Sequence, residues 1–485
     1  MNKPLRRIAI FCGLLVLALM IRDNWLQYVR ADELNTHKLN KRVEIERYAH
    51  ARGNIVVEGK AITGSEETDD TYYKFKRTYT DGPMWAPVTG YASQVFGANQ
   101  IEKLEDGILS GNSDQLFFDR TMAMFTGDEK KGGNVVTTLN AKAQEAAFKG
   151  LGDKKGAVAA IDPKTGKILA LASTPSYDPA SFAGRLKDDE KAWVSLTEDE
   201  DKPMLNRALR ETYPPGSTFK VVTAAAALEN GKVDDIDAAT DTPEPYILPG
   251  TRTPMVNHAQ GCENASLNRA MEVSCNSVFA KLGDDVSRDK MVETAEKFGF
   301  NNPEIDTPVR AAASVYDKEM SRDGNAQSAI GQFNTAATPL QMAMVTAAIA
   351  NDGKLMKPYM IDKLESPDLE VVQQNEPEEM SRPVSAENAQ LLQQMMENVV
   401  ERGTGGNAAI PGVKVGGKTG TAQHGENNSK NPYAWFISYA KDANGSPVAV
   451  AVVVEDSDAS RDDISGGGLA APIAKAVMKA VLDDK

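Results

Sequence analysis

Hydrophobic and polar positions divide the chain into an apolar start, a polar first third and a strongly patterned remainder. Residues 8–21 are fourteen consecutive uncharged positions, most of them apolar. Residues 31–133 are mainly polar, and only short segments such as 54–57 and 72–79 have the composition of strands. From residue 134 onward, apolar residues recur with helical or strand-like spacing. The pattern therefore predicts a leading apolar segment, a small polar module and a larger folded domain.

The larger domain has predicted strands at both of its ends and predicted helices between them. A turn at 162–166 divides the apolar run 156–173 into two strands of a hairpin. The other elements follow from spacing alone: strands at 433–440 and 447–455 around Asn444-Gly445, and helices at 141–150, 221–228, 385–401 and 469–482. Ser385 is the expected N-cap of one helix and Gly403 its stop. This order predicts an α+β fold, in which one antiparallel sheet is covered by helices.

The apolar run near the start is shorter than the roughly 20 residues of a membrane-spanning helix and has the length of a signal-peptide core. It is preceded by the basic residues Lys3, Arg6 and Arg7. No small-x-small cleavage site follows it, and Trp25 and Tyr28 stand where interfacial aromatic residues lie. These features favour an uncleaved anchor. A cleaved signal peptide and a buried core helix are the alternatives.

The charges around this run predict its orientation. Basic residues before it and acidic sequence after it indicate a cytoplasmic N-terminus and an extracytoplasmic body at the cell membrane. We therefore expect a cytoplasmic tail (1–7), a transmembrane anchor (8–28), a non-catalytic N-terminal module (29–133) and a C-terminal domain (134–485). Residues 128–133 are the expected linker between the last two. The body would lie in an oxidising compartment.

The composition is that of an ordinary globular protein, since 41% of the 485 residues are hydrophobic and 25% are charged. The 54 Lys and Arg residues against 68 Asp and Glu residues give a net charge of −14, which argues against nucleic acid as a partner. The three cysteines and four histidines do not fall at metal-ligand spacing, so we expect no metal. The histidines are His37, His50, His258 and His424.

A Ser followed three residues later by Lys places both side chains on one face of a helix, where the amine can take the hydroxyl proton. The spacing occurs three times: Ser217/Lys220, Ser287/Lys290 and Ser438/Lys441. Ser438 lies in a predicted strand, where residues three apart point to opposite faces. Ser287 opens a charged helix and has the character of an N-cap. Ser217 follows an abrupt Tyr-Pro-Pro-Gly turn and begins an apolar helix. We therefore expect Lys220 to be buried, with a lowered pKa that lets its amine act as a base near neutral pH.

For an isolated match, a capping Ser and a surface Lys would be the simpler interpretation. A second spacing, Ser-x-Asn, occurs at Ser110/Asn112, Ser266/Asn268, Ser274/Asn276 and Ser429/Asn431. The first and last pairs lie in polar, turn-rich sequence, and Ser266 is the expected start of a helix. Ser274-Cys275-Asn276 lies between two helical stretches, where a hydroxyl and an amide can line a cleft.

The tripeptide Lys-Thr-Gly occurs twice. Lys164-Thr165-Gly166 belongs to the predicted hairpin turn and is expected to face water. Lys418-Thr419-Gly420 follows the strand-like residues 413–417 and precedes Thr421. The glycines around it would let another backbone approach closely. Such a strand can bind an extended substrate by strand addition, with Lys418 attracting a carboxylate.

The order of these motifs is more specific than any one of them. Ser274 follows Ser217 by 57 positions, and Lys418 follows it by 201. The set resembles the penicillin-recognising serine acyl-transferases. Tail, anchor, N-terminal module and C-terminal domain together resemble a class B penicillin-binding protein. Three further segments are similar to that family, although Val56-Val57-Glu58-Gly59 departs from its usual sequence after the first: Arg52-Gly53-Asn54-Ile55, Ile330-Gly331-Gln332 and Thr338-Pro339-Leu340-Gln341.

The resemblance implies a penicillin-binding transpeptidase fold and a peptidoglycan D,D-transpeptidase that needs no cofactor. The implied catalytic residues are Ser217 as nucleophile, Lys220 as base, Ser274 as proton relay, Asn276 as a contact to the substrate amide, and Lys418. Thr419, Gly420 and Thr421 are the implied substrate-binding residues, and Lys418 and Thr419 would bind the terminal carboxylate. The implied partners are peptidoglycan stem peptides, β-lactams that acylate the nucleophile, and other cell-wall synthesis or division proteins.

Other functions share part of this pattern. A β-lactamase needs a base for water, and residues 263–268 resemble its Glu-x-x-Leu-Asn segment but contain one residue too many and precede Ser274. A β-lactam-sensing receptor needs further spans or a signalling domain. A D,D-carboxypeptidase would share every motif and transfer the acyl group to water. A non-catalytic cell-wall scaffold would not need Ser217, Lys220 and Lys418 together. The last two are kept as alternatives.

Cys262 and Cys275 are the candidates for a disulfide, because Cys12 lies in the predicted anchor. Closing a loop of this size stabilises a protein by about 3 kcal/mol in the chain-entropy model. Because Cys275 stands between Ser274 and Asn276, the bond would fix the middle of the second motif. Two buried free thiols are the alternative.

Overall fold

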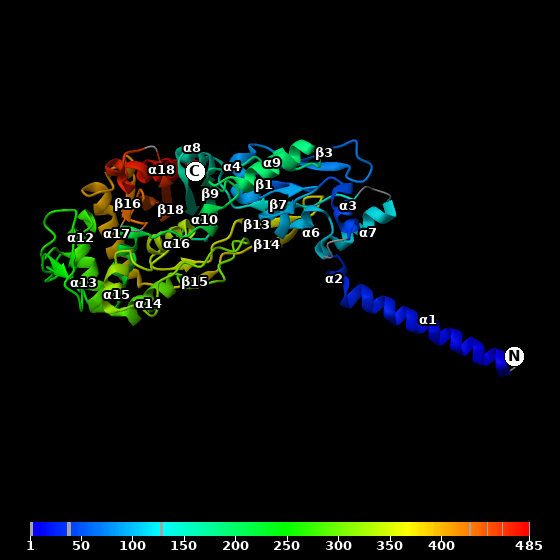
Figure 1. The fold of residues 1–485 in the computed structure, drawn as a ribbon, viewed down its shortest axis with the longest axis horizontal. Coiled ribbons are helices and arrows are strands. Elements are labelled where there is room, and N and C mark those ends of the chain that lie inside the picture. The colour runs from blue at the N-terminus through cyan, green and yellow to red at the C-terminus, as the bar shows by residue number, and fades with distance from the viewer. Residues whose placement is uncertain are drawn as a thin grey trace.

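The computed structural model describes residues 3–35, 40–126, 130–425, 428–443, 445–457 and 459–484. Its body is elongated, and the N-terminal helix α1 projects from one end of it (Figure 1). His37, the turn residue Asn444 and residues 128–129 of the expected linker lie outside the described residues.

The C-terminal domain is built on one five-stranded sheet with the order β16-β17-β18-β8-β9, and every pair in it is antiparallel. Its strands are β8 (Lys155–Ile161), β9 (Ile168–Thr174), β16 (Lys414–Ala422), β17 (Tyr433–Asp442) and β18 (Gly445–Asp456). The strands therefore come from both ends of the domain, as the sequence predicted. β16 lies at one edge of the sheet, which leaves it a free side for another chain.

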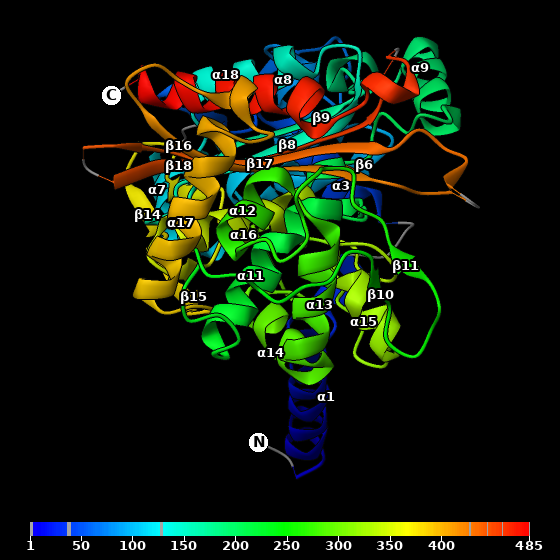
Figure 2. The ribbon, with the colours of Figure 1, turned by 90° about the vertical axis from the view of Figure 1, so that its left-hand side faces the viewer.

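Helices cover both faces of this sheet (Figure 2). α8 (Ala141–Leu151) and α18 (Ala471–Leu482) pack on one face, and α16 (Pro339–Ala350) and α17 (Ala386–Glu401) pack on the other. Both faces of β18 are thereby buried, which explains its nearly continuous apolar sequence. The α+β arrangement predicted from the sequence is confirmed.

A helical subdomain lies on the α16 side of the sheet. It contains α11 (Lys220–Glu229), α12 (Leu267–Val273), α13 (Asn276–Val286), α14 (Arg288–Lys297) and α15 (Arg322–Ser328). As predicted, Ser385 and Ser266 are N-caps: Ser385 Oγ accepts from Asn388 N, and Ser266 Oγ accepts from Arg269 N. α17 ends at Glu401 with Arg402 as its C-cap, one residue before the predicted stop at Gly403.

A second sheet joins the N-terminal module to the rest of the chain, and the sequence did not predict it. Its order is β14-β13-β7-β1-β2. The strands are β1 (Ile55–Val57), β2 (Lys60–Ala61), β7 (Asn134–Thr137), β13 (Ile361–Glu365) and β14 (Val371–Gln374). β1 and β7 pair in parallel, so strands on either side of residue 133 share one sheet. Strands of two to five residues carry too little periodicity to be recognised in a sequence.

The remaining elements are shorter. In the N-terminal module they are α2 (Ala31–Asn35), α3 (Lys41–Ala49), β3 (Thr63–Glu67), β4 (Phe75–Tyr79), α4 (Gly82–Thr89), β5 (Ala92–Ser93), β6 (Gly97–Ala98), α5 (Gln100–Leu104), α6 (Asp106–Leu109) and α7 (Phe117–Thr126). In the C-terminal domain they are α9 (Lys187–Glu198), α10 (Arg207–Arg210), β10 (Tyr246–Ile247), β11 (Pro254–Met255), β12 (Leu355–Met356) and β15 (Glu379–Ser381). The predicted strands 54–57 and 72–79 correspond to β1 and β4.

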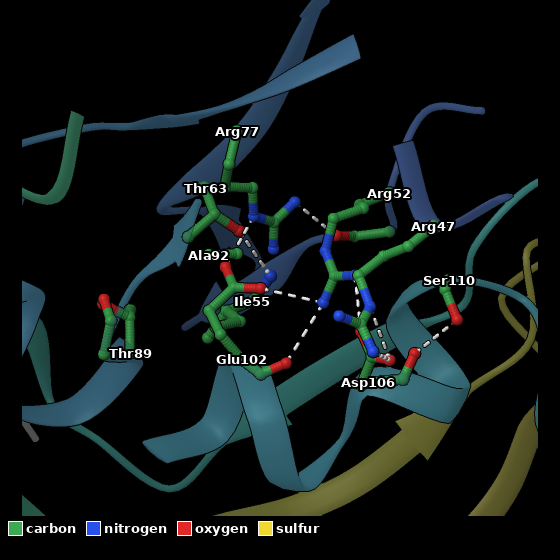
Figure 3. A network of polar contacts seen from close by, with 12 residues as sticks. Arg47, Arg52, Ile55, Thr63, Arg77, Thr89, Ala92, Glu102, Asp106 and Ser110 are labelled. Atoms are coloured by element: carbon green, nitrogen blue, oxygen red, sulfur yellow. Dashed lines mark hydrogen bonds and ion pairs between the residues drawn. The ribbon is translucent and has the colours of Figure 1, made fainter. Parts of the chain in front are cut away.

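Buried charges organise the N-terminal module (Figure 3). Glu102 on α5 is fully buried between two arginines, with Arg77 Nε 2.5 Å from its Oε1 and Arg52 Nη2 3.1 Å from its Oε2. Arg52 also donates to Asp106 on α6 at 2.6 Å, and Arg47 on α3 donates to the same carboxylate. Arg52, which the family resemblance singled out, thus connects its own segment to two helices.

The described part of the expected linker is packed rather than free. Gly133 is buried, and its N–H donates to Ile108 O at 2.9 Å. Gly53 lies directly against it, since a Cβ on Gly53 would be 1.8 Å from Gly133 O. Glycine is therefore required where these two segments meet. The glycines within residues 130–133 are explained by this close approach of two backbone segments.

The N-terminal helix is longer than the apolar run that predicted it. α1 covers Lys3–Val29, and none of its described residues is buried by the body. Its 27 residues exceed the roughly 20 that cross a bilayer. Arg22 lies over the ring of Trp25 at 4.6 Å, near the end where interfacial residues were predicted. This helix fits a single-pass membrane anchor.

Candidate active site

A cleft of about 810 Å³ runs between the edge strand β16 and the helical subdomain. It is lined by residues of all three sequence motifs together with several others: Ser217, Ser274, Asn276, Thr419, Thr421, Met255, His258, Gln332, Phe333 and Gly466 are among them. The structure therefore brings together motifs that lie 57 and 201 positions apart in the sequence.

Ser217 lies in a short 3-10 turn, Gly216–Phe219, immediately before α11. Gly216 has φ of +52°, and a Cβ there would lie 3.1 Å from Thr421 O. The turn can therefore press against β16 only because this residue is glycine. Ser217 is half-buried on the floor of the cleft, as the Pro-Pro-Gly sequence before an apolar helix predicted.

Lys220 is fully buried at the start of α11. Its Nζ donates to Ser274 O at 2.8 Å, to Ser274 Oγ at 3.1 Å and to Asn276 Oδ1 at 2.7 Å. In this geometry the amine faces the second motif, and the hydrogen bonds described for it do not include Ser217 Oγ. Burial, and then the nearby charge of Lys418, lower the pKa of Lys220 well below its ordinary value. A lysine in these surroundings can act as a base.

Ser274 and Asn276 come from the junction between α12 and α13. Ser274 ends α12 in the left-handed region, with φ of +65°. Such a conformation costs a non-glycine residue roughly 1 to 2 kcal/mol, and it turns the Ser274 hydroxyl toward both lysines. The neighbouring Cys275 forms a disulfide with Cys262, which confirms the predicted pairing. Both cysteines are fully buried, and Cys12 is free.

Lys418 approaches the same hydroxyl from β16. Its Nζ donates to Ser274 Oγ at 2.8 Å and to Thr419 O at 3.2 Å. The side chain is fully buried, and burial lowers the pKa of Lys418 to about 7. Two amines thus share one serine oxygen. Because their like charges repel, the two ammonium forms disfavour each other, and one neutral amine beside one cation is the favoured combination near neutral pH.

Thr419 and Thr421 face the cleft from β16, as expected for substrate-binding residues. Thr419 Oγ1 is hydrogen-bonded to Thr404 Oγ1 at 2.6 Å. Gly420 lies between them, and a Cβ there would be 3.0 Å from Pro215 O. This glycine allows the nucleophile's turn and the edge strand to touch, which is the close backbone approach that the sequence predicted.

Lys441, Lys164 and Ser287, which belong to other matches to the motifs, do not line this cleft. Lys441 donates from β17 to Gln393 Oε1, and Lys164 lies in the β8–β9 turn. Ser287 occupies the predicted N-cap position of α14, but it makes no side-chain cap hydrogen bond. The cleft is lined by residues from the copies of the motifs that the sequence argument selected: Ser217, Ser274, Asn276 and Thr419.

The sequence analysis did not predict the contacts of two residues that support the turn containing the nucleophile. Gly331 has φ of +74°, its O accepts from Gly216 N at 3.0 Å, and a Cβ on it would lie 2.1 Å from Gly216 O. Trp435 Nε1 donates to Pro214 O at 3.0 Å. The Ile-Gly-Gln segment was singled out by resemblance, so a signal existed for Gly331. The sequence carried no comparable signal for Trp435.

These groups define the chemistry that the cleft can perform. A partly exposed serine stands at the start of a helix, a serine hydroxyl beside it contacts two buried amines, and threonine hydroxyls line an edge strand. Such groups can transfer an acyl group through a covalent serine intermediate, in which the amines and the second hydroxyl move the serine proton. Fold and cleft together define a penicillin-binding transpeptidase.

Comparison with known proteins agrees with this class. The family of the penicillin-binding protein transpeptidase domain matches residues 156–479, and the penicillin-binding protein A dimerisation domain matches residues 52–135. The chain belongs to the penicillin-binding proteins with a transpeptidase domain.

Among its relatives are the peptidoglycan D,D-transpeptidases PbpA of Mycolicibacterium smegmatis and Mycobacterium tuberculosis. Each is 38% identical, with 99% of both chains covered. Among solved structures, the ceftriaxone acyl-enzyme complex of penicillin-binding protein A from M. tuberculosis has a TM-score of 0.85 and 38% identity, and covers 90% of this chain and 100% of that one. The penicillin G acyl-enzyme complex of the same protein has a TM-score of 0.83.

Proposed function

We propose that this protein is a peptidoglycan D,D-transpeptidase that cross-links stem peptides through a Ser217 acyl-enzyme. The observation that carries the proposal is the convergence of two buried lysines on Ser274 Oγ, at 3.1 and 2.8 Å, beside a serine in an open cleft. The names and the acyl-enzyme structures of close relatives support the same reaction. A scaffold protein would have no need to bury two lysines at one hydroxyl, since this costs free energy.

In the first half-reaction, Ser217 Oγ attacks the penultimate D-Ala carbonyl of a stem peptide. Neutral Lys220 takes the hydroxyl proton, and Ser274 passes a proton to the leaving amine of the terminal D-Ala. The C–N bond breaks and an ester to Ser217 remains. Lys418 and Thr419 attract the terminal carboxylate, with Thr421 beside them. The N–H groups of Ser217 and Thr421 stabilise the oxyanion.

In the second half-reaction, an amine of another stem peptide attacks the ester carbonyl. Its proton returns through Ser274 and Lys220 to Ser217 Oγ, so the enzyme is regenerated and a new amide cross-links the two peptides. Asn276 contacts the amide of the bound stem peptide. A β-lactam follows only the first half-reaction, because its leaving amine stays attached to the acyl group.

We also propose the arrangement of the chain at the membrane. Residues 1–7 form a cytoplasmic tail, 8–28 cross the membrane, 29–133 form a non-catalytic module and 134–485 form the transpeptidase domain outside the cell membrane. The basic residues in the first turns of α1, the length of this helix and the separate family matches to residues 52–135 and 156–479 support this division. Other cell-wall synthesis or division proteins are the expected protein partners.

A fluorescent penicillin tests the nucleophile. The protein should be labelled covalently, peptide mapping should find the adduct at Ser217, and Ser217→Ala should remove the label. Ser438→Ala is the matched control, because this serine has the same spacing to a lysine but lies in β17. A label that persists in Ser217→Ala, or that maps elsewhere, would contradict the assignment.

Cross-linking itself distinguishes transpeptidation from hydrolysis. With a stem-peptide donor and an amine acceptor, the acyl group should pass mainly to the amine. The penicillin adduct should be lost only over hours, since none of the described residues that line the cleft carries a carboxylate to activate water. Release of D-Ala without an amide product would favour the D,D-carboxypeptidase.

A further inference from the structure

The N-terminus of α13 is capped by a side chain from outside the helix. Cys275 occupies the N-cap position, but its sulfur is bonded to Cys262 and it makes no side-chain cap hydrogen bond. Asn257 supplies the missing acceptor, because its Oδ1 accepts from Asn276 N at 2.7 Å and from Ser277 N at 3.0 Å. These are two of the N–H groups that a helix start leaves without an intrahelical partner.

The residue before Asn257 fixes the side chain of Asn276. Asn276 Nδ2 donates to Val256 O at 2.8 Å, while Asn276 Oδ1 accepts from Lys220 Nζ at 2.7 Å. A carbonyl oxygen only accepts, so Val256 O requires the NH₂ group of the amide and leaves the amide oxygen facing the Lys220 amine. Rotated by half a turn, the amide would place its NH₂ against Lys220 and its oxygen against a carbonyl.

Asn257 is itself held in one orientation. Its Nδ2 donates to Ser277 Oγ at 2.8 Å and to Glu244 Oε1 at 3.1 Å, so both ends of the amide are engaged. The β10–β11 hairpin that precedes it lies beside α13 (Figure 2). At the far end of the same loop, the disulfide ties Cys262 to the residue before Asn276. The loop is therefore fixed on both sides of Asn257.

We infer that Asn257 is a positioning residue for the second motif: by capping α13 from a distance it holds Asn276 with its oxygen toward Lys220. The inference rests on the proposed acyl transfer at Ser217. Asn257 is not among the residues that line the cleft, and it touches neither lysine. It acts through Asn276, which keeps the Lys220 amine beside Ser274.

Asn257→Ala is the direct test, with rapid-mixing kinetics of a fluorescent penicillin to separate non-covalent binding from the acylation step. The acylation rate constant should fall roughly ten- to hundredfold, because a displaced Asn276 misplaces Lys220. The non-covalent dissociation constant should rise by a smaller factor than the acylation rate constant falls, because Asn276 is only one of several groups that contact the ligand. The acid limb of the acylation pH profile should move to lower pH, because protonated Lys220 loses the Asn276 oxygen as an acceptor.

A second variant separates positioning from folding. Asn257→Asp with Glu244→Gln keeps two acceptor oxygens for the α13 N–H groups and avoids two adjacent carboxylates. It should recover most of the acylation rate. Asn302→Ala is the matched control, because Asn302 Oδ1 also accepts a backbone N–H, from Glu304 at 2.9 Å, in an exposed turn outside the cleft. The control should acylate like the parent protein.

Several results would overturn the inference. One is an unchanged acylation rate in Asn257→Ala. Another is an equal loss of acylation rate in Asn257→Ala and in the double variant. A third is weaker non-covalent binding in Asn257→Ala with an unchanged acylation rate constant and an unchanged pH profile. These outcomes are distinct from failure of the proposed function, in which the parent protein itself would take no label at Ser217.

Discussion

Lys220 and Lys418 are both fully buried and both donate to Ser274 Oγ, yet their surroundings differ. Lys220 has three acceptors on the second motif, whereas the other described acceptor of Lys418 is the carbonyl of Thr419, at the edge of the cleft. In the proposed mechanism, the first amine transfers the proton, and the second keeps a positive charge beneath β16, the strand proposed to bind substrate.

Arginine substitutions should separate these two roles. Lys220→Arg should reduce the acylation rate by about 10² to 10⁴, because a guanidinium stays protonated and cannot act as a base. Lys418→Arg keeps the charge and should lose only part of the rate. Labelling by penicillin over time measures both, and equal losses from the two variants would show that the base is assigned wrongly.

The pH dependence of acylation should have two limbs. Lys220 must be neutral, so the rate should rise as pH passes its lowered pKa. Lys418 must be protonated to attract a carboxylate, and its pKa is about 7, so apparent affinity should fall as pH rises through 7. In Lys418→Arg this alkaline limb should disappear, since the group stays charged. An alkaline limb that is identical in the variant would contradict this origin.

At the scale of the elements, the Arg52–Glu102–Arg77 cluster holds α5 against the segment that leads into β1. Glu102 is fully buried and serves both guanidinium groups. Arg77 Nη1 also donates to Gly53 O at 2.7 Å, so the cluster reaches the point where β1 and β7 meet. Loss of an ion pair in this cluster should therefore destabilise the sheet that contains β1 and β7 and leave the cleft unchanged.

Glu102→Gln should destabilise this module by about 3 to 5 kcal/mol, because it removes the carboxylate that pairs with buried Arg77 and leaves Arg52 with Asp106 alone. Urea unfolding, with hydrogen exchange of β1 and β7 to locate the loss, measures the effect. Glu293→Gln is the control: this exposed carboxylate pairs with Lys290 and Lys297 on α14, and its removal should change the free energy of unfolding little, because water screens exposed ion pairs. Equal stability of the two variants would contradict the cluster's importance.

For the whole molecule, α1 projects from one end of the body, and the second sheet connects the N-terminal module to the C-terminal domain (Figure 1). The cleft lies in the domain remote from α1, on the edge of the first sheet. Two strands of the second sheet belong to the same stretch of chain as the first sheet. In the sequence, β7 precedes β8, and β13 lies between β9 and β16. In the proposed arrangement at the membrane, the module lies between the anchor and the domain that contains the cleft.

Cysteine accessibility should establish the orientation. In a Cys12→Ser background, a membrane-impermeant maleimide applied to intact cells should label Tyr72→Cys, whose parent side chain is 63% exposed. Lys3→Cys should be labelled only after the membrane is permeabilised. Labelling of Lys3→Cys in intact cells, or protection of Tyr72→Cys, would reverse the proposed topology.

The sequence by itself determined the elements with strong periodicity and the choice of motifs. The long apolar strands β17 and β18, the hairpin of β8 and β9, and the helices α8, α17 and α18 were predicted within a few residues, because each buries a continuous face. Ser217, Ser274 and Lys418 were selected from several copies by their local context and order. The Cys262–Cys275 pair followed from counting cysteines in an oxidising compartment.

Only the tertiary structure decided what depends on contacts between distant segments. The sheet shared by β1, β7 and β13 consists of strands too short to show a period, and residues 130–133 are packed because Gly53 lies against them. Lys418 was expected to attract a carboxylate, but its contact with Ser274 requires β16 to lie beside the α12–α13 junction. Asn257 caps a helix 19 positions away. A hydrogen bond of this kind leaves no periodic trace in a sequence, because its geometry exists only after the chain has folded.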